Sequence, residues 1–180
     1  MELIKDEQNF LQLYDQYVEK IYRYIFFRVG SEELAEDLTS DVFLRSWQYI
    51  NQTEGPNPGT KKLENPRAFF YQVARNLIAD FHRQKDRSPI SLGEITDKRI
   101  ADKEDGPIEI ISKTMEIETV RKALVGLNDD YQEIIIWRYL EEMEIKEIAD
   151  ILGKSDGAVR VLLSRALNSL KRLLDEIPRR

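Results

Sequence analysis

The sequence contains no cysteine, and this absence excludes several classes of protein. A disulfide scaffold, a thiolate metal site and a cysteine nucleophile all require that residue. The chain has a single histidine, His82, which excludes a metal site built from several histidines. No phosphate-binding glycine loop is present either. We therefore expect neither an enzyme nor a protein with a metal, a cofactor or a small-molecule substrate.

Glycine and proline are also scarce, with eight and six residues among 180, which argues against a loop-rich or disordered chain. No apolar run approaches the roughly 20 residues needed to span a bilayer. The N-terminus, Met1–Asp6, lacks the basic region and apolar core of a signal peptide. These absences together predict a cytoplasmic protein.

The net charge of −6 at first argues against nucleic acid, because DNA binders usually present a strongly positive face. The charge is unevenly distributed, however. Residues 154–180 hold seven Lys/Arg and three acids, a local charge of +4. Residues 31–41 hold five acids and no base, a local charge of −5. One end of the chain suits a polyanion, and the other suits a basic partner.

Hydrophobic residues recur at helical spacing over most of the chain, and nothing reads as a strand. Ser31 and Asn65-Pro66 give start signals for two of the helices. The pattern predicts helices over 8–29, 31–50, 65–85, 116–126, 129–140, 144–152 and 156–176. We predict an all-α fold of two small helical domains, 1–86 and 116–180, joined by a flexible linker, 87–115, rich in breakers and acids.

The most specific motif is a helix-turn-helix pattern over residues 145–163. Ala149 is small enough for a second helix to cross closely above it, and Gly153 suits the left-handed turn between the helices. An ordinary helical hairpin is the competing interpretation, but the basic residues after 154 favour DNA. The residues expected to face a major groove are Lys154, Ser155, Asp156, Gly157, Arg160, Ser164 and Arg165.

Two further surfaces stand out, each with a plain structural alternative. The helix from Asn65 carries Arg and amide side chains beside aromatic ones, which suits unpaired bases but also fits a solvated helix face. Its candidate contacts, off the expected buried stripe, are Arg67, Tyr71, Gln72, Arg75, Asn76, His82 and Arg83. The acidic run at 31–41 indicates a binding face, although acids in a first helical turn often only complement the helix dipole.

These features, in this order, resemble the sigma-70 superfamily of RNA polymerase sigma factors, specifically the small extracytoplasmic-function (ECF) subgroup. Residues 35–47 look like the polymerase-binding helix of that family, and 65–80 like the helix that melts and reads the −10 element. Residues 121–174 look like the −35-reading domain. The chain departs from the family at a few positions. The family often has proline where this chain has Asn128, a basic residue where it has Gln72, and Ser and Arg where it has Val161 and Leu162. These departures concern which promoter sequence is read, and they do not affect the assignment to the family.

The resemblance implies partners and roles for named residues. Core RNA polymerase would be bound by Glu36, Asp37, Asp41 and Arg45. The −10 strand would be gripped by Arg67, Tyr71, Gln72, Arg75, Asn76 and Arg83. Promoter DNA at −35 would be read by the helix from Asp156, with Arg160 as the guanine contact. An anti-sigma factor is a further implied partner.

The main alternative is a stand-alone helix-turn-helix regulator that does not join polymerase. Such a protein would use 144–174 and leave 31–41 and 65–83 without a role. A helical adaptor that binds no nucleic acid is a third interpretation. Co-elution with core polymerase and a mobility shift of promoter DNA separate these alternatives from a sigma factor.

Overall fold

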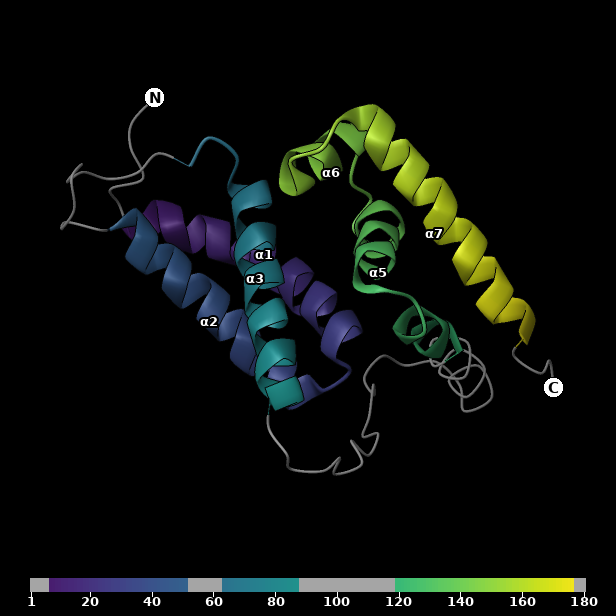
Figure 1. Cartoon of the computed structure of the whole chain (residues 1–180). Coiled ribbons are helices and arrows are strands. Elements are labelled where there is room, and N and C mark those ends of the chain that lie inside the picture. Colours follow the sequence, from purple (N-terminus) through teal and green to yellow (C-terminus); the bar gives the residue numbers. More distant parts are fainter. Residues whose placement is uncertain (1–6, 52–62, 88–118, 177–180) are drawn as a thin grey trace, which may run out of the picture.

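The computed structural model describes residues 7–51, 63–87 and 119–176. Within these ranges the chain is helical and contains no strand. The predicted all-α class is confirmed. The predicted linker, 87–115, lies almost wholly outside the described residues, so the domain boundaries stay a prediction. Figure 1 shows two groups of helices side by side, α1 to α3 and α5 to α7.

The first unit consists of three helices that enclose an aromatic-rich core. They are α1 (Glu7–Val29), α2 (Glu32–Ile50) and α3 (Pro66–Arg87). The predicted caps are confirmed, since the Ser31 hydroxyl accepts from the Leu34 amide at 3.3 Å and the Asn65 side chain accepts from the Ala68 amide at 3.0 Å. The core packs rings from all three helices against one another: Phe10, Phe43, Trp47, Tyr17 and Phe70.

The second unit is built from α5 (Asp129–Ile135), a π-helical turn η1 (Ile136–Leu140), α6 (Ile145–Leu152) and α7 (Asp156–Glu176). The single helix predicted over 129–140 is therefore an α-helix that widens into a π-helix. Such turns are uncommon and often lie at functional sites. Residues 119–125 are helical as well, within the helix predicted over 116–126. The prediction of a long last helix from 156 is confirmed.

The end of η1 turns the chain sharply enough to bury two neighbouring side chains. Glu142 has a φ of +51°, a left-handed conformation that is uncommon for a residue other than glycine. The residues on either side of it, Glu141 and Met143, are both buried, whereas Glu142 is exposed. The turn thus directs a carboxylate and a thioether inward toward the first unit.

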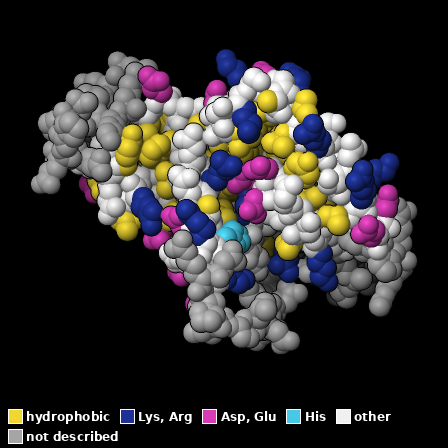
Figure 2. Space-filling model, in the orientation of Figure 1, with side chains coloured by type: hydrophobic (Ala, Val, Ile, Leu, Met, Phe, Trp, Pro, Cys, Tyr) yellow, Lys and Arg dark blue, Asp and Glu magenta, His cyan; other side chains and the backbone are white. Residues whose placement is uncertain are grey.

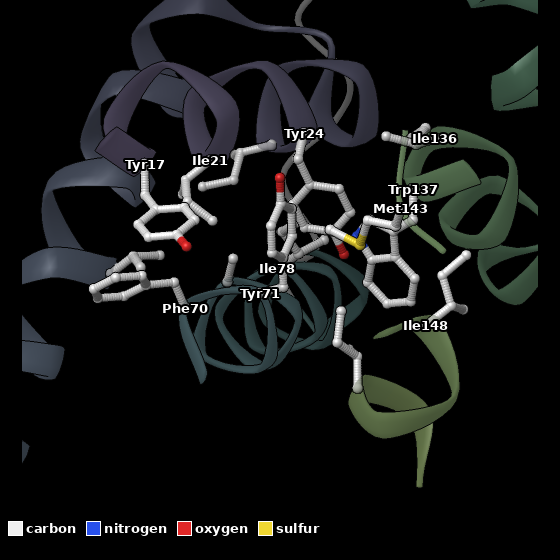
Figure 3. Packing of buried hydrophobic residues seen from close by; sticks show 14 of the residues in the cluster. Tyr17, Ile21, Tyr24, Phe70, Tyr71, Ile78, Ile136, Trp137, Met143 and Ile148 are labelled. Carbon is white, nitrogen blue, oxygen red and sulfur yellow. The ribbon is translucent and has the colours of Figure 1, made fainter. Parts of the chain in front are cut away.

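The two units share one continuous core. Tyr24 of α1, Tyr71 of α3 and Trp137 of η1 are each fully buried. The ring centroids of Tyr24 and Trp137 lie 5.7 Å apart and nearly stacked, and Tyr71 meets Tyr24 edge-on at 5.4 Å. Figure 3 shows these rings with Met143 between α1, α3 and the second unit. We call this contact, including the polar groups around it, the seam.

The helix-turn-helix gives a sharp test of the local conformations. Gly153 has a φ of +62°, and Gly157 lies inside α7; an ideal Cβ on either would meet nothing within 4 Å. We expect Gly153→Ala to lower the free energy of unfolding by about 1 kcal/mol because of left-handed strain. Gly157→Ala should raise it by up to about 1 kcal/mol through helix propensity. Urea unfolding of the full chain measures both, and changes of the same sign would contradict the turn geometry.

Candidate nucleic-acid interface

The helix-turn-helix forms as the sequence predicts. Ile148, Ala149 and Val159 are buried, so α6 and α7 cross on a small, apolar contact. The Ser155 hydroxyl accepts a hydrogen bond from the Ala158 amide at 3.2 Å and so caps α7. Because Val159 and Ala166 fix the inner face of α7 on the core, its opposite face is turned outward.

All seven residues predicted to read the −35 element lie on the exposed surface of this motif. They are Lys154, Ser155, Asp156, Gly157, Arg160, Ser164 and Arg165. Figure 1 shows α7 as the outer helix of the second unit, away from α1 to α3. Five of them lie on α7, and Lys154 and Ser155 lie in the turn just before it, so all seven are accessible at this end of the motif. Their contacts with DNA remain a prediction.

The acidic surface of α2 is accessible in the same way. Glu36, Asp37, Asp41 and Arg45 are all exposed, whereas Leu38, Val42 and Phe43 point into the core. The acids influence a neighbouring residue of α1: burial, together with the negative charges of Glu32 and Glu36, raises the pKa of Tyr22. The face thus carries an excess of negative charge, three acids against one base among these four residues.

The polar residues of α3 behave differently, because most of them are engaged by the second unit. Arg67 Nη1 pairs with Glu147 Oε1 at 2.8 Å, and Arg67 Nη2 donates to the Glu141 carbonyl at 2.7 Å. Gln72 Nε2 donates to the Ile151 carbonyl at 3.3 Å. Arg75 Nε pairs with Glu133 Oε2 at 2.9 Å. Three side chains expected to grip a DNA strand are thus bound by carboxylates and carbonyls of the same chain.

The expected position of Tyr71 is wrong. The sequence places it off the buried stripe of α3, among the DNA contacts, but the side chain is fully buried at the seam. Its hydroxyl donates to Glu141 Oε2 at 2.9 Å. Burial, and next the negative charge of Glu141, raises the pKa of Tyr71. The periodicity was misleading because α3 buries two faces, one in its own unit and one at the seam.

The remaining candidates of α3 are outside the seam. Asn76 and Arg83 are exposed. Arg83 forms an ion pair with Asp80 one turn earlier in the same helix, and His82 is half-buried beside Phe81. Asn76 and Arg83 therefore stay accessible, while Arg67, Gln72 and Arg75 are held.

Two buried carboxylates organise the seam, and sequence reasoning identified neither. Glu133 pairs with Arg28 at 2.8 Å and with Arg75 at 2.9 Å, and accepts from the Tyr24 hydroxyl at 3.2 Å. Glu141 pairs with Arg23 at 2.7 Å and accepts from Tyr71. Both glutamate side chains are less than 5% exposed. No local sequence signal predicts these pairs, since the partners lie 58 to 118 residues apart in the sequence.

These contacts hold charges of opposite sign against each other. Over the middle of the face shown in Figure 2, where α3 meets α5 and α6, basic side chains lie directly beside acidic ones. A buried ion pair gains Coulomb energy but loses hydration, so the net contribution to stability is small. Breaking one partner away is much more costly, because a buried charge is left uncompensated. The ion pairs of the seam therefore add little net stability to that of its buried rings.

Other kinds of site are missing from the part of the chain that the structure describes. No group of three or more potential metal ligands occurs among these residues. In the same ranges, none of the helices has the length and apolar character to cross a membrane.

Comparison with known families identifies the two units separately. The family model described as Sigma-70 region 2 matches residues 13–88, and the model described as Sigma-70, region 4, matches residues 117–170. The chain is 35% identical over 184 residues to the ECF RNA polymerase sigma factor BldN of Streptomyces coelicolor. That match spans 98% of the chain and 66% of BldN, so the chain has about two thirds of BldN's length.

Another relative is similar over nearly its whole length. The RNA polymerase sigma factor YlaC of Bacillus subtilis is 28% identical over 169 residues, 94% of each protein. Two solved structures share the fold, each at 20% sequence identity. The sigma factor RpoE in complex with the anti-sigma factor NepR, from Bartonella quintana, has a TM-score of 0.66 over 95% of the chain and 99% of RpoE. CnrH in complex with the cytosolic domain of CnrY has a TM-score of 0.67 over 97% of the chain and 92% of CnrH.

The buried charge of Glu133 gives a prediction for the seam. Glu133→Gln should destabilise seam packing by about 3 kcal/mol, because it leaves Arg28 and Arg75 without their buried partner. Asp130→Asn is the matched control: its pair with Arg75 is exposed and 3.5 Å long, so the loss should stay below about 1 kcal/mol. In a Trp47→Phe background, fluorescence of the fully buried Trp137 during urea titration reports opening of the seam. Equal effects of the two variants would show that Glu133 does not organise the seam.

Proposed function

The chain belongs to the extracytoplasmic-function subgroup of the sigma-70 superfamily, and from this premise we propose how its surfaces divide the work of a sigma factor. Sigma factors bind core RNA polymerase and direct it to promoters, and they are not enzymes. We infer that this chain does so with α2 on polymerase, α3 on the −10 strand and α7 on the −35 duplex. The work takes place in the cytoplasm, where polymerase and promoter are found.

The observation that carries this division is the contrast between open and occupied surfaces. The α2 acids and the outer face of α7 are exposed in the free chain. Arg67 and Arg75 of α3 are paired with Glu147 and Glu133. A guanidinium that binds a carboxylate can also bind a phosphate, because both anions accept hydrogen bonds from its paired N–H groups. The second unit thus occupies with its own carboxylates the groups proposed to hold the DNA backbone.

The free chain is therefore proposed to be a closed form in which strand gripping is blocked. Binding to polymerase has to separate the seam before α3 reaches unpaired DNA. The weak net energy of buried ion pairs makes such a separation accessible to a binding partner. Residues Asn76 and Arg83, which stay exposed in the closed form, are proposed to meet DNA alongside the released Arg67, Gln72 and Arg75.

An anti-sigma factor is proposed as a further partner. The sigma factor RpoE was solved with the anti-sigma factor NepR, and CnrH with the cytosolic domain of CnrY. Each has the fold of this chain. A protein that binds across both units would hold them together and keep α3 occupied. A stand-alone regulator, by contrast, would have no use for the exposed acidic face of α2.

Opening of the seam is directly measurable, because the chain has no cysteine of its own. A donor and an acceptor dye on Gln12→Cys of α1 and Asn168→Cys of α7 report the distance between the units. Energy transfer should be efficient in the free chain and fall when core polymerase is added. A pair within the first unit, Gln12→Cys with Gln84→Cys, should be unaffected. Unchanged transfer in both pairs at saturating polymerase would mean that the closed form persists and that the proposal is wrong.

The acidic face of α2 gives a second test. Glu36→Lys with Asp37→Lys should weaken binding to core polymerase by about tenfold and make the remaining affinity less dependent on salt, because the attraction is electrostatic. Asp175→Lys with Glu176→Lys at the end of α7 reverses the same number of exposed charges and serves as the control. Titration against core polymerase over a salt series decides the matter. A loss of equal size for both variants would reflect net charge, not a binding face.

A further inference from the structure

The outer face of α7 carries an apolar side chain among polar ones. Val161 is 52% exposed, although Val159 and Ala166 of the same helix are completely buried. Each residue advances an α-helix by about 100°, so position 161 lies almost opposite position 159. Val161 therefore belongs to the face of Gly157 and Arg160, not to the core.

Neighbouring hydrophobic residues of α7 have a different environment. Leu162 and Leu163 are partly buried and pack against the core. A β-branched residue at an exposed helix position also favours the helix less than alanine does. Core packing and helix formation thus both fail to explain a valine at 161. A single exposed apolar residue is ordinary on a protein surface, so the significance of Val161 depends on what surrounds it.

Its surroundings are those of a base-reading surface. Arg160, Ser164 and Arg165 are exposed beside it and offer hydrogen-bond donors. One turn earlier, Gly157 has no side chain, and a Cβ built there would meet nothing within 4 Å. The backbone of the first turn is therefore free to approach a groove closely. A close approach brings the side chains of the next turn, Val161 among them, to the base edges.

We propose that Val161 reads the 5-methyl group of a thymine in the −35 element; the inference rests on the proposed function of α7. The thymine methyl is the apolar group that a base pair presents in the major groove, and apolar side chains recognise it by contact. The donors of Arg160 and Ser164 suit purine acceptors instead. Val161 thus adds selectivity for an A·T pair at one position, next to the guanine contact expected of Arg160.

The test removes the methyl group without changing hydrogen bonding. Holoenzyme reconstituted with the wild-type chain first selects its −35 element from a randomised library. Each thymine of that element is then replaced, one at a time and on either strand, by deoxyuridine, which keeps the O4 acceptor and lacks the methyl. Holoenzyme affinity should fall about fourfold at one position, the size expected for loss of one buried methyl contact.

The variant Val161→Ala identifies the reader of that methyl group. The affinity of holoenzyme with Val161→Ala for the thymine duplex should fall by about the same factor, and at that position alone it should no longer depend on deoxyuridine. The control is Val125→Ala, at a 58% exposed valine outside α7, which should keep the wild-type profile. Three outcomes would overturn the inference and leave −35 reading intact. The wild-type affinity could be the same with deoxyuridine at every position, the selected element could contain no A·T pair, or the wild type and Val161→Ala could give identical profiles. Selection of no −35 sequence at all would overturn the proposed function of α7, and this inference with it.

Discussion

The burial of Glu133 is the constraint on which the closed arrangement depends. A carboxylate in an apolar surrounding is unstable unless opposite charges and hydrogen bonds compensate it. Here the compensation comes from outside its own unit, from Arg28 and Tyr24 of α1 and from Arg75 of α3. Helix α5 is therefore held at one position against two helices at once. The apolar part of the seam, Tyr24 against Trp137, supplies the contact area, and the ion pairs supply the register.

The sequence predicted what depends on local signals. Caps such as Ser31, the turn at Gly153 and the inner stripe of α7 are consequences of near neighbours, and all three formed as expected. The position of Tyr71 was not predictable in this way, because the seam that buries it is made by residues of the second unit. The same holds for Glu133 and Glu141, whose partners are fixed only by tertiary packing. The seven −35 candidates are exposed, as the inner stripe of α7 implies, but their roles stay a prediction because they depend on DNA, which periodicity does not describe.

On the proposed assignment, the same side chains of α3 serve in two states, and the chemistry of the seam is compatible with both. Arg67 and Arg75 keep their positive charge in either state, since an arginine does not lose its proton, and both can therefore pair with an anion in either state. In the closed chain the anions are Glu147 and Glu133. On the proposed assignment, phosphates of the −10 strand replace them when the units separate. One anion thus takes the place of another at the same guanidinium groups.

Which surfaces are hidden sets the order of events on this assignment. A partner shifts a conformational equilibrium only by its difference in affinity for the two states. Ligands of α2 and α7 meet faces that are exposed in the closed chain, so they have access before opening. To part the seam, polymerase must in addition make contacts that only the separated units allow, because its contact with α2 alone does not discriminate between the two states. A single strand at α3 favours the open state, because Arg67 and Arg75 give up their carboxylate partners to it only after the seam has parted, whereas Asn76 and Arg83 are exposed in both states. Recognition of polymerase and duplex therefore precedes strand capture. A protein that binds only the closed form stabilises the seam. Because coupling between two binding events is reciprocal, it makes strand capture less favourable by the same free energy.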